Sequence, residues 1–294
     1  MKRSYVFFIL PVILALLLFF FFPLEEIIRY SFTNARLFEK GYSYTLINYK
    51  MIFTDPDFLH SLKITVIFVV FSVIGQVGFG LLLGLLFYRM ENIGLRFFSL
   101  VTRTVIVSAW VLPGVAIGIM WKLMFSDFQF GIVNYFLSHF VFHKPTMISF
   151  LSNARNALII VTVSNIWRGL AFSMLLQYAA LKQVPKELYE VASLDGANKL
   201  QKFFYITLPS ISQQLLINIT IATISTFNVF DAILSLTRGG PGKSTEVLSL
   251  MVYRSVFSNT DLSYGSAVGV ILLIINLLIS IMYLRIIFRK EVRA

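Results

Sequence analysis

Two apolar stretches of this chain carry polar residues at helical spacing. Within residues 156–180, Asn165, Gly169 and Phe172 recur at i, i+4 and i+7, and Arg168 lies beside them. An amide, a guanidinium and an aromatic ring on neighbouring helix positions can bind a polar solute by hydrogen bonds and ring contacts. Because an Arg near a bilayer centre costs roughly 2.5–3.5 kcal/mol, Arg168 is expected to face a partner helix or a wet cavity.

The second stretch, residues 213–236, has a polar face of its own. Ser225, Asn228 and Asp231 follow one another at i, i+3 and i+6 and cover a face roughly 120° wide. Two interpretations stay open on spacing alone. Small and polar residues of this kind commonly pack helices together in a membrane. They also line polar translocation paths near the midplane.

The composition is that of an integral membrane protein. The chain has 294 residues, of which 57% are apolar and only 13% charged. Soluble domains carry about 25% charged residues. The net charge of +11 is therefore assigned to Lys- and Arg-rich cytoplasmic loops rather than to nucleic-acid binding. The absence of Cys excludes disulfides and thiol chemistry within this chain.

The elements that position the polar residues are predicted to be transmembrane helices. The first span covers residues 5–24, read as a retained helix rather than a cleaved signal peptide. The sequence predicts an all-α membrane protein of six transmembrane helices forming a single transmembrane domain over residues 1–294, with its core helices at about 60–290. The remaining five spans are predicted at 64–88, 99–122, 156–180, 213–236 and 266–288.

The distribution of basic residues predicts the orientation of these spans. With the N-terminus inside, the inner segments have about twice the Lys and Arg density of the outer loops, the direction of the positive-inside rule. Both termini are then cytoplasmic, and so is the loop 185–209. Residues 129–142 are apolar on a helical repeat between polar segments, which favours an interfacial or re-entrant helix over a seventh span.

Residue patterns for catalysis and metal binding are missing. The three histidines, His60, His139 and His143, fall in predicted outer regions without a second ligand type at helical spacing, so no metal site is expected. The run TRGGPGKST at 237–245 ends like a phosphate-binding loop, but Thr237 stands where such a loop needs its first Gly. We interpret the run as an outer turn and expect no ATP binding through it.

The polar stretch between Pro185 and Pro209 predicts a helix–turn–helix knob. Pro185 suits a helix start, and a short helix is expected from 186 to about 194. Gly196 follows where a left-handed turn is easiest for Gly, and residues 197–205 can form a second short helix. An apolar knob among charges fits another protein's groove, although a solvated loop explains the pattern equally well.

The knob resembles the EAA loop of binding-protein-dependent ABC importer permeases. The family pattern is roughly E-A-A-x-x-D-G-A followed by F-x-x-I-T-L-P, and Val191 replaces the usual Ala. The matching positions are Glu190, Val191, Ala192, Ser193, Leu194, Asp195, Gly196, Ala197, Phe203, Ile206, Thr207, Leu208 and Pro209.

The resemblance extends over nearly the whole chain and points to the maltose/oligosaccharide-type branch. Asn48-Tyr49, with Phe53, Asp55, Pro56 and Phe58, resembles that branch's segment before the second span, and Pro113 with Trp121 resembles its third span. The run 165–169 resembles its fourth span. Residues 236–241, with Thr245 and Tyr253-Arg254, resemble its Leu-Thr-x-Gly-Gly-Pro loop, although Arg238 departs from the commoner Asn or Gly.

The resemblance implies the MetI-like architecture of a type I ABC importer and a set of partners. These are a second, homologous permease subunit, two ATP-binding subunits that hold ATP and Mg, and an extracellular or periplasmic binding protein that delivers a sugar. No cofactor and no catalytic activity are expected in this chain, and the location implied is the cytoplasmic membrane of a bacterium or archaeon. Substrate contacts would fall nearest Asn165, Arg168, Gly169, Phe172, Ser225, Thr226, Asn228, Val229 and Asp231.

Three other functions compete with that of a sugar importer. A passive channel needs no ATP and no EAA-like loop, and a membrane-embedded enzyme lacks its catalytic residues here. The same transporter type carrying glycerol phosphates or another polar metabolite is also open, because Arg168 and Arg238 could serve an anion.

Overall fold

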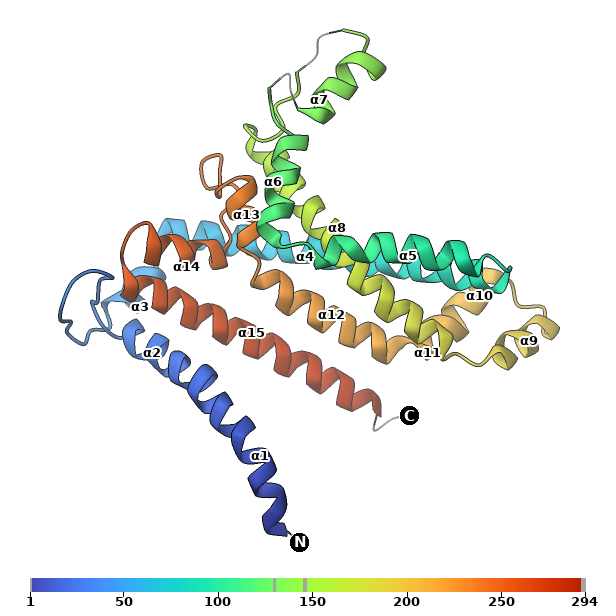
Figure 1. Ribbon diagram of the computed structural model, residues 1–294, viewed down its shortest axis with the longest axis horizontal. Coiled ribbons are helices and arrows are strands. Elements are labelled where there is room, and N and C mark those ends of the chain that lie inside the picture. Colours follow the sequence, from blue (N-terminus) through green and yellow to red (C-terminus); the bar gives the residue numbers. More distant parts are fainter. Residues whose placement is uncertain (1, 129–130, 145–146, 292–294) are drawn as a thin grey trace. The chain divides into compact units, whose positions relative to one another are not determined.

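The computed structural model describes residues 2–128, 131–144 and 147–291 (Figure 1). Every named element in these ranges is helical, and one isolated β-bridge pairs Thr33 with Tyr44. The first half contains α1 (Lys2–Leu16), η1 (Leu17–Phe21), α2 (Phe22–Ser31), α3 (Ile47–Ile52), α4 (Pro56–Asn92), α5 (Arg96–Val111), α6 (Gly114–Met124), α7 (Ile132–Phe136) and η2 (Leu137–Val141). The second half contains α8 (Ala154–Lys182), α9 (Lys186–Leu194), α10 (Lys199–Lys202), η3 (Phe203–Thr207), α11 (Leu208–Ser210), α12 (Ser212–Phe227), α13 (Asp231–Leu236), α14 (Leu248–Phe257) and α15 (Leu262–Glu291).

Among the residues that the structure describes, four helices are long and apolar enough to cross a membrane. They are Ile9–Ser31, Pro56–Asn92, Ala154–Lys182 and Leu262–Ile286. The helix pair α5 and α6, bent by 102°, makes a fifth span if it is counted as one. The chain is therefore a multi-pass, all-helical membrane protein, and the predicted first span is longer than residues 5–24 because the helix continues to Ser31.

Two of the predicted spans are interrupted. The span predicted at 99–122 breaks at Leu112 and Pro113, since Pro113 lacks an N–H and restricts the residue before it. The span predicted at 213–236 divides into α12 and α13 around residues 228–230. The count of six spans thus stays a prediction. Of the segment 129–142, residues 129 and 130 lie outside the described residues, and Ile132–Val141 form a short apolar helix.

The chain divides into two compact units. The first comprises residues 1–63 with 248–277, and the second comprises residues 64–247 with 278–294. In the first unit, the buried Asn48 amide donates to the carbonyls of Ser31 and Thr33 at 3.2 and 2.7 Å. Tyr264 donates from its hydroxyl to the Asp55 carboxylate, which ties α15 to the start of α4.

Small residues bring α4 and α8 together in the second unit. A Cβ on Gly80 would lie 2.9 Å from the backbone nitrogen of Met174, and one on Gly84 would lie 3.3 Å from the Gln177 Cβ. Glycines at such positions let two helix backbones approach closely, as in small-xxx-small membrane packing. The α8 helix begins at a capped end, because Asn153 accepts hydrogen bonds from the N–H groups of Arg155 and Asn156.

The short helices α6 and α13 pack by the same device. A Cβ on Gly114 would overlap the Asp231 carboxylate, and one on Gly118 would overlap the Ser235 hydroxyl and the Ala232 carbonyl oxygen. Gly114 and Gly118 are one turn apart, so one face of α6 admits the first turn of α13. This packing fixes the position of Asp231 next to the two helix breaks.

Candidate functional site

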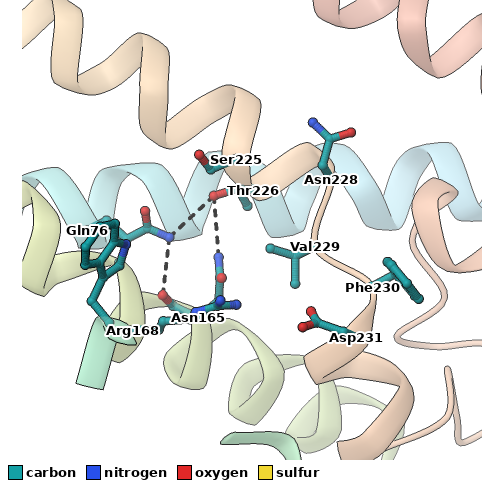
Figure 2. Close-up of a pocket in the computed structure, with 11 residues that line it drawn as sticks. Gln76, Asn165, Arg168, Ser225, Thr226, Asn228, Val229, Phe230 and Asp231 are labelled. Carbon is teal, nitrogen blue, oxygen red and sulfur yellow. Dashed lines mark hydrogen bonds between the residues drawn. The ribbon is translucent and has the colours of Figure 1, made fainter. Parts of the chain in front are cut away.

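A polar pocket of about 400 Å³ lies where α4, α5, α8 and the α12–α13 break meet (Figure 2). Its lining mixes amides, hydroxyls, one cation, one carboxylate and two aromatic rings. The lining residues are Gln76, Trp110, Asn165, Arg168, Gly169, Ser225, Thr226, Asn228, Val229, Phe230 and Asp231.

A three-residue amide and hydroxyl network joins the helices at the pocket wall. The Gln76 Nε2 group donates to the Asn165 carbonyl oxygen at 3.3 Å and to the Thr226 hydroxyl at 3.4 Å. The Asn165 Nδ2 group donates to the same hydroxyl at 3.5 Å. Figure 2 shows this triangle between α4, α8 and α12. Gln76 and Thr226 are buried, and their hydrogen bonds to each other and to Asn165 hold the helices together.

The pocket lining includes two charged side chains of opposite sign. Arg168 and Asp231 both line it, yet within the described ranges neither side chain has a hydrogen-bond or ion-pair partner. An isolated charge in an apolar medium is costly, so these two groups imply a hydrated site. A guanidinium donates and a carboxylate accepts, so together they can bind hydroxyl groups of either polarity.

Aromatic residues form another part of the wall. Trp110 lines the pocket and stacks on Phe172, with ring centroids 5.3 Å apart and ring planes at 25°. Phe230 lines the pocket from the α12–α13 break. An apolar ring surface beside hydrogen-bonding groups suits a solute that has both an apolar face and polar edges.

The structure brings together eight of the nine residues that the sequence placed on the path: Asn165, Arg168, Gly169, Ser225, Thr226, Asn228, Val229 and Asp231. Phe172 lies behind the wall, stacked on Trp110, and does not line the pocket. Sequence reasoning missed Gln76, Trp110 and Phe230. Gln76 had a signal of its own, since it is the one amide in the apolar stretch 64–88. Packing and lining coexist here, because Gly169 also accommodates Gln76 at close range.

The loop 185–209 folds as a helix–turn–helix knob. The predicted first helix is α9, and Gly196 follows it with φ of +76°. The Gly196 N–H donates to the Ser193 carbonyl at 3.2 Å and the Ala197 N–H donates to the Ala192 carbonyl at 2.9 Å, which is a Schellman ending. Asn198 and Gln201 form a capping box at the start of α10.

The knob has an anchored side and an exposed side. Tyr189 and Ile206 pack against a buried cluster of Ala180, Leu181, Val184 and Ile211 at the ends of the flanking helices. The Tyr189 hydroxyl lies 2.9 Å from the Thr207 hydroxyl. Leu194 is 88% exposed, and Leu188 and Val191 are exposed as well. The outer side of the knob is thus exposed while its inner side is fixed to the flanking helices.

The predicted coupling residues lie around this exposed side. Ala192, Asp195, Gly196 and Ala197 line a cavity of about 330 Å³ between α9 and the second helical segment. Glu190 is exposed and has no partner among the described residues. The remaining predicted positions are Val191 and Leu194 on α9, Phe203 at the start of η3, and Pro209 in α11.

The run 237–245 is a turn held by hydrogen bonds among its own residues. It follows α13 rather than a strand, and the Thr245 hydroxyl binds the Gly240 carbonyl at 3.0 Å and the Thr237 hydroxyl at 2.7 Å. The Thr245 N–H donates to the Gly239 carbonyl at 3.1 Å. A phosphate-binding loop opens a helix directly from a strand, so this geometry differs from a nucleotide site.

Comparison with known proteins places this architecture. Residues 76–292 match the family described as "Binding-protein-dependent transport system inner membrane component". The probable ABC transporter permease protein YurN of Bacillus subtilis is 31% identical over 92% of this chain and 92% of its own length. The sulfoquinovosyl glycerol transport system permease protein SmoG of Agrobacterium fabrum is 30% identical over 96% of this chain and 89% of its own.

A solved structure has the same fold. A chain of a bacterial ABC transporter that imports the acidic polysaccharide alginate superposes with a TM-score of 0.82 at 21% identity, covering 98% of this chain and 96% of that one. The family match covers more than half of the residues and the helices have a permease arrangement. This chain is therefore a member of the binding-protein-dependent transport system inner membrane component family, and it is a transport permease rather than an enzyme.

Proposed function

We propose that this chain carries a sugar or oligosaccharide across the cytoplasmic membrane of a bacterium or archaeon, as one permease subunit of an ATP-driven importer. The observation that carries the proposal is the knob 185–209, which presents apolar side chains outward and is anchored inward to α8 and α12. Both helices lead to the polar pocket, so one movement of the knob can reach both of its walls.

The energy for transport comes from other chains. Two ATP-binding subunits would receive the knob in their grooves and would hold ATP and Mg, and a second homologous permease would complete the path. A binding protein on the outer side would deliver the cargo. Six spans with both termini in the cytoplasm would place the knob on the side of the ATP-binding subunits, and the basic residues of the inner segments support this orientation.

The proposed mechanism is alternating access. Closure of the ATP-binding subunits pushes the knob, and α8 and α12 tilt with it because the buried cluster at their ends resists separation. The pocket then opens to the outer side and receives the cargo. ATP hydrolysis would release the knob and expose the pocket to the cytoplasm.

The pocket supports a sugar as cargo. A sugar ring has hydroxyl groups that can pair with Arg168, Asp231 and Asn228, and an apolar face that can lie on Trp110. The relative SmoG is named for a sulfoquinovosyl glycerol carrier, which agrees with a glycoside cargo. A glycerol phosphate is the alternative, since Arg168 is a cation that lines the pocket without an ion-pair partner among the described residues. A passive channel is disfavoured, because passive flux requires no anchored segment for contact with an ATP-binding subunit.

The knob is tested by substitutions that leave the membrane helices unchanged. Gly196→Val places a β-branched residue at φ of +76° and should strain the turn by about 1 kcal/mol or more. Glu190→Lys reverses an exposed charge of α9. We expect both variants to insert normally but to lose uptake and co-purification of the ATP-binding subunit.

Gly196→Asn is the matched control, because Asn tolerates the left-handed conformation. It should retain most of the uptake. Wild-type uptake and wild-type ATPase co-purification in both Gly196→Val and Glu190→Lys would refute the coupling role of the knob.

A further inference from the structure

A second cavity, of about 340 Å³, lies where α4 ends, α5 begins and α8 leads into the knob. Its lining holds three cationic side chains and one carboxylate, with an amide, a phenol and a valine completing it. The lining residues are Tyr88, Glu91, Asn92, Arg96, Lys182, Val184 and Lys186.

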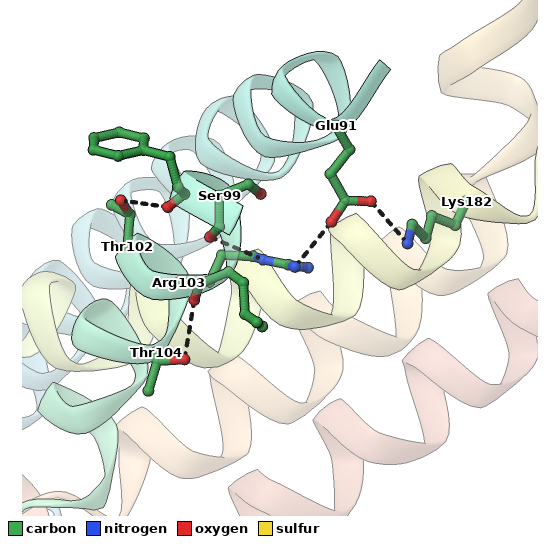
Figure 3. A network of polar contacts seen from close by, with 8 residues as sticks. Glu91, Ser99, Thr102, Arg103, Thr104 and Lys182 are labelled. Atoms are coloured by element: carbon green, nitrogen blue, oxygen red, sulfur yellow. Dashed lines mark hydrogen bonds and ion pairs between the residues drawn. The ribbon is translucent and has the colours of Figure 1, made fainter. Parts of the chain in front are cut away.

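The carboxylate in this cavity, that of Glu91, already forms ion pairs with two cations. Glu91 accepts from the Arg103 guanidinium at 2.9 Å and from the Lys182 ammonium at 2.9 Å, as Figure 3 shows. Arg103 in turn stacks over the Tyr178 ring, 4.0 Å from its centroid. The single acid is therefore shared by two cations and cannot neutralise the other two basic residues of the cavity.

Arg96 and Lys186 are left without a counter-ion. Both are exposed, and in the described part of the chain neither side chain has a hydrogen-bond or ion-pair partner. Asn92, on the same wall, has no partner there either. The cavity lining therefore has three cations and one carboxylate, and the carboxylate is already ion-paired. This leaves an excess of two positive charges, which favours an anionic ligand.

The rim of the cavity identifies the type of anion. Arg96 is flanked on the α4–α5 turn by Ile93, Leu95 and Phe97, whose side chains are exposed, Phe97 at 79%. Exposed apolar side chains next to unpaired cations are typical of a membrane interface, where basic side chains meet headgroups and apolar ones meet acyl chains. A free phosphate ion would gain nothing from these apolar residues.

We propose that this cavity binds the phosphate of an anionic phospholipid, with Arg96 and Lys186 as its principal ligands. Basic pockets between membrane helices bind such headgroups on the cytoplasmic side. That this cavity faces the cytoplasmic leaflet rests on the proposed function, since Lys186 is the first residue of α9 and belongs to the knob. The lipid would then bridge the α4–α5 turn and the start of α9.

The test is lipid binding to the full-length, delipidated chain in detergent, followed by native mass spectrometry. Dioctanoyl phosphatidylglycerol, dioctanoyl phosphatidylcholine and inorganic phosphate are the three probes. We expect phosphatidylglycerol to bind tightest of the three probes. The double variant Arg96→Gln with Lys186→Gln should weaken its binding about tenfold or more, because each basic residue near a charged lipid surface contributes to the affinity.

The matched control is Arg89→Gln with Lys199→Gln. It removes two positive charges from exposed residues that do not line the cavity, and binding should change by less than about threefold. The proposed site would be overturned if both double variants weakened phosphatidylglycerol binding equally, or if the unchanged protein bound phosphatidylcholine as tightly as phosphatidylglycerol. Inorganic phosphate that displaces the lipid at a similar concentration would overturn the lipid assignment. Because the assay contains no ATPase and no cargo, a negative result would leave the proposed permease function standing.

Discussion

At the scale of single residues, Arg168 and Asp231 are the two charged groups by which the proposed cargo pocket would select its solute. Both line the pocket, and neither has a partner among the described residues. Hydrogen bonds to charged groups contribute about 1.5–3 kcal/mol each, or roughly tenfold to a hundredfold in binding. Their opposite signs mean that a neutral cargo can use both, whereas the charged group of an anion can use only the guanidinium and is repelled by the carboxylate.

The two charges therefore separate a sugar from a glycerol phosphate. For a neutral sugar, Arg168→Gln and Asp231→Asn should each lower uptake by the reconstituted transporter about tenfold or more. For a glycerol phosphate, Arg168→Gln should abolish uptake while Asp231→Asn leaves it equal or higher, because a repelling charge is removed. Arg155→Gln, on the same helix but outside the pocket, is the control. Unchanged uptake in both pocket variants would exclude them from the cargo path.

Another prediction at the residue scale concerns Asp127, which lies between α6 and α7 and accepts hydrogen bonds from the segment before α8. Burial opposes its ionisation, but hydrogen bonds from the Ser152 side chain and from the N–H groups of residues 150–152 outweigh this and hold its pKa below the ordinary value of 3.8. The folded loop thus favours the ionised form. The stabilisation is complete above pH 3.8 and is lost as the pH falls through the lowered pKa.

Amide hydrogen exchange measures this contribution. Protection of the Phe150, Leu151 and Ser152 amides, corrected for intrinsic rates, should be constant from pH 8 to about 5 and should fall only under more acidic conditions. Asp127→Asn should remove much of the protection at pH 7, since a neutral amide is a weaker acceptor. Asp195→Asn, in the knob, should leave these amides unchanged. Constant protection in the Asp127 variant would contradict the role assigned to this carboxylate.

At the scale of elements, the contact between α4 and α8 depends on which glycines face it. A Cβ on Gly80 would meet the Ser173 Cβ and the Met174 backbone, whereas one on Gly78, two residues earlier on the same helix, has nothing within 4 Å. Gly80→Ala should therefore destabilise the protein by about 1–3 kcal/mol through overpacking. Gly78→Ala should be neutral or stabilising by up to about 1 kcal/mol, because Ala is the better helix former.

Thermal unfolding in detergent compares the two variants under identical conditions. A lower midpoint for Gly80→Ala and an equal or higher midpoint for Gly78→Ala is the expected result. Equal midpoints would mean that α4 and α8 adjust their separation freely, which would contradict the close approach described here.

The same scale shows what sequence can and cannot predict for this fold. The α9 helix and its ending depend on Pro185 and Gly196, whose backbone preferences are local, and both were predicted. The break at residues 228–230 was not, because Asn228, Val229 and Phe230 include neither Gly nor Pro. There the chain turns to place α13 against the glycines of α6, which is a tertiary effect.

Site residues divide in the same way. Asn165 was predicted from polar spacing along a single helix and Thr226 from the family resemblance, and both line the pocket. Gln76 was missed because its partners lie 89 and 150 residues away, a relation that one sequence does not display. Phe172 shares the periodicity of Asn165 and Gly169, yet its ring is taken by Trp110. Periodicity indicates the side of a helix that is polar, whereas the neighbouring helices decide which side chains reach the cavity.

At the scale of the whole molecule, α8 connects the two functional regions. Arg168 faces the pocket and Lys182 ends the helix next to the knob, a distance of about 21 Å at 1.5 Å per residue. Glu91 holds Lys182 and Arg103 together there, so that α4, α5 and α8 share one ion-paired junction. The side chains of Glu91 and Arg103 are only 11% and 14% exposed, which makes this junction less screened than a surface pair.

Glu91→Gln should therefore both destabilise the protein and weaken coupling. Losing the carboxylate leaves two cations facing each other, and we expect a loss of about 2 kcal/mol or more in unfolding free energy. Glu39→Gln is the control, because its pair with Arg36 spans 3.8 Å at an exposed site and should contribute less than about 1 kcal/mol. In the reconstituted transporter, Glu91→Gln should lower the cargo moved per ATP, since α4 and α5 no longer follow α8. An unchanged ratio, together with a lowered unfolding midpoint, would show that the junction stabilises the fold without transmitting the movement of the knob.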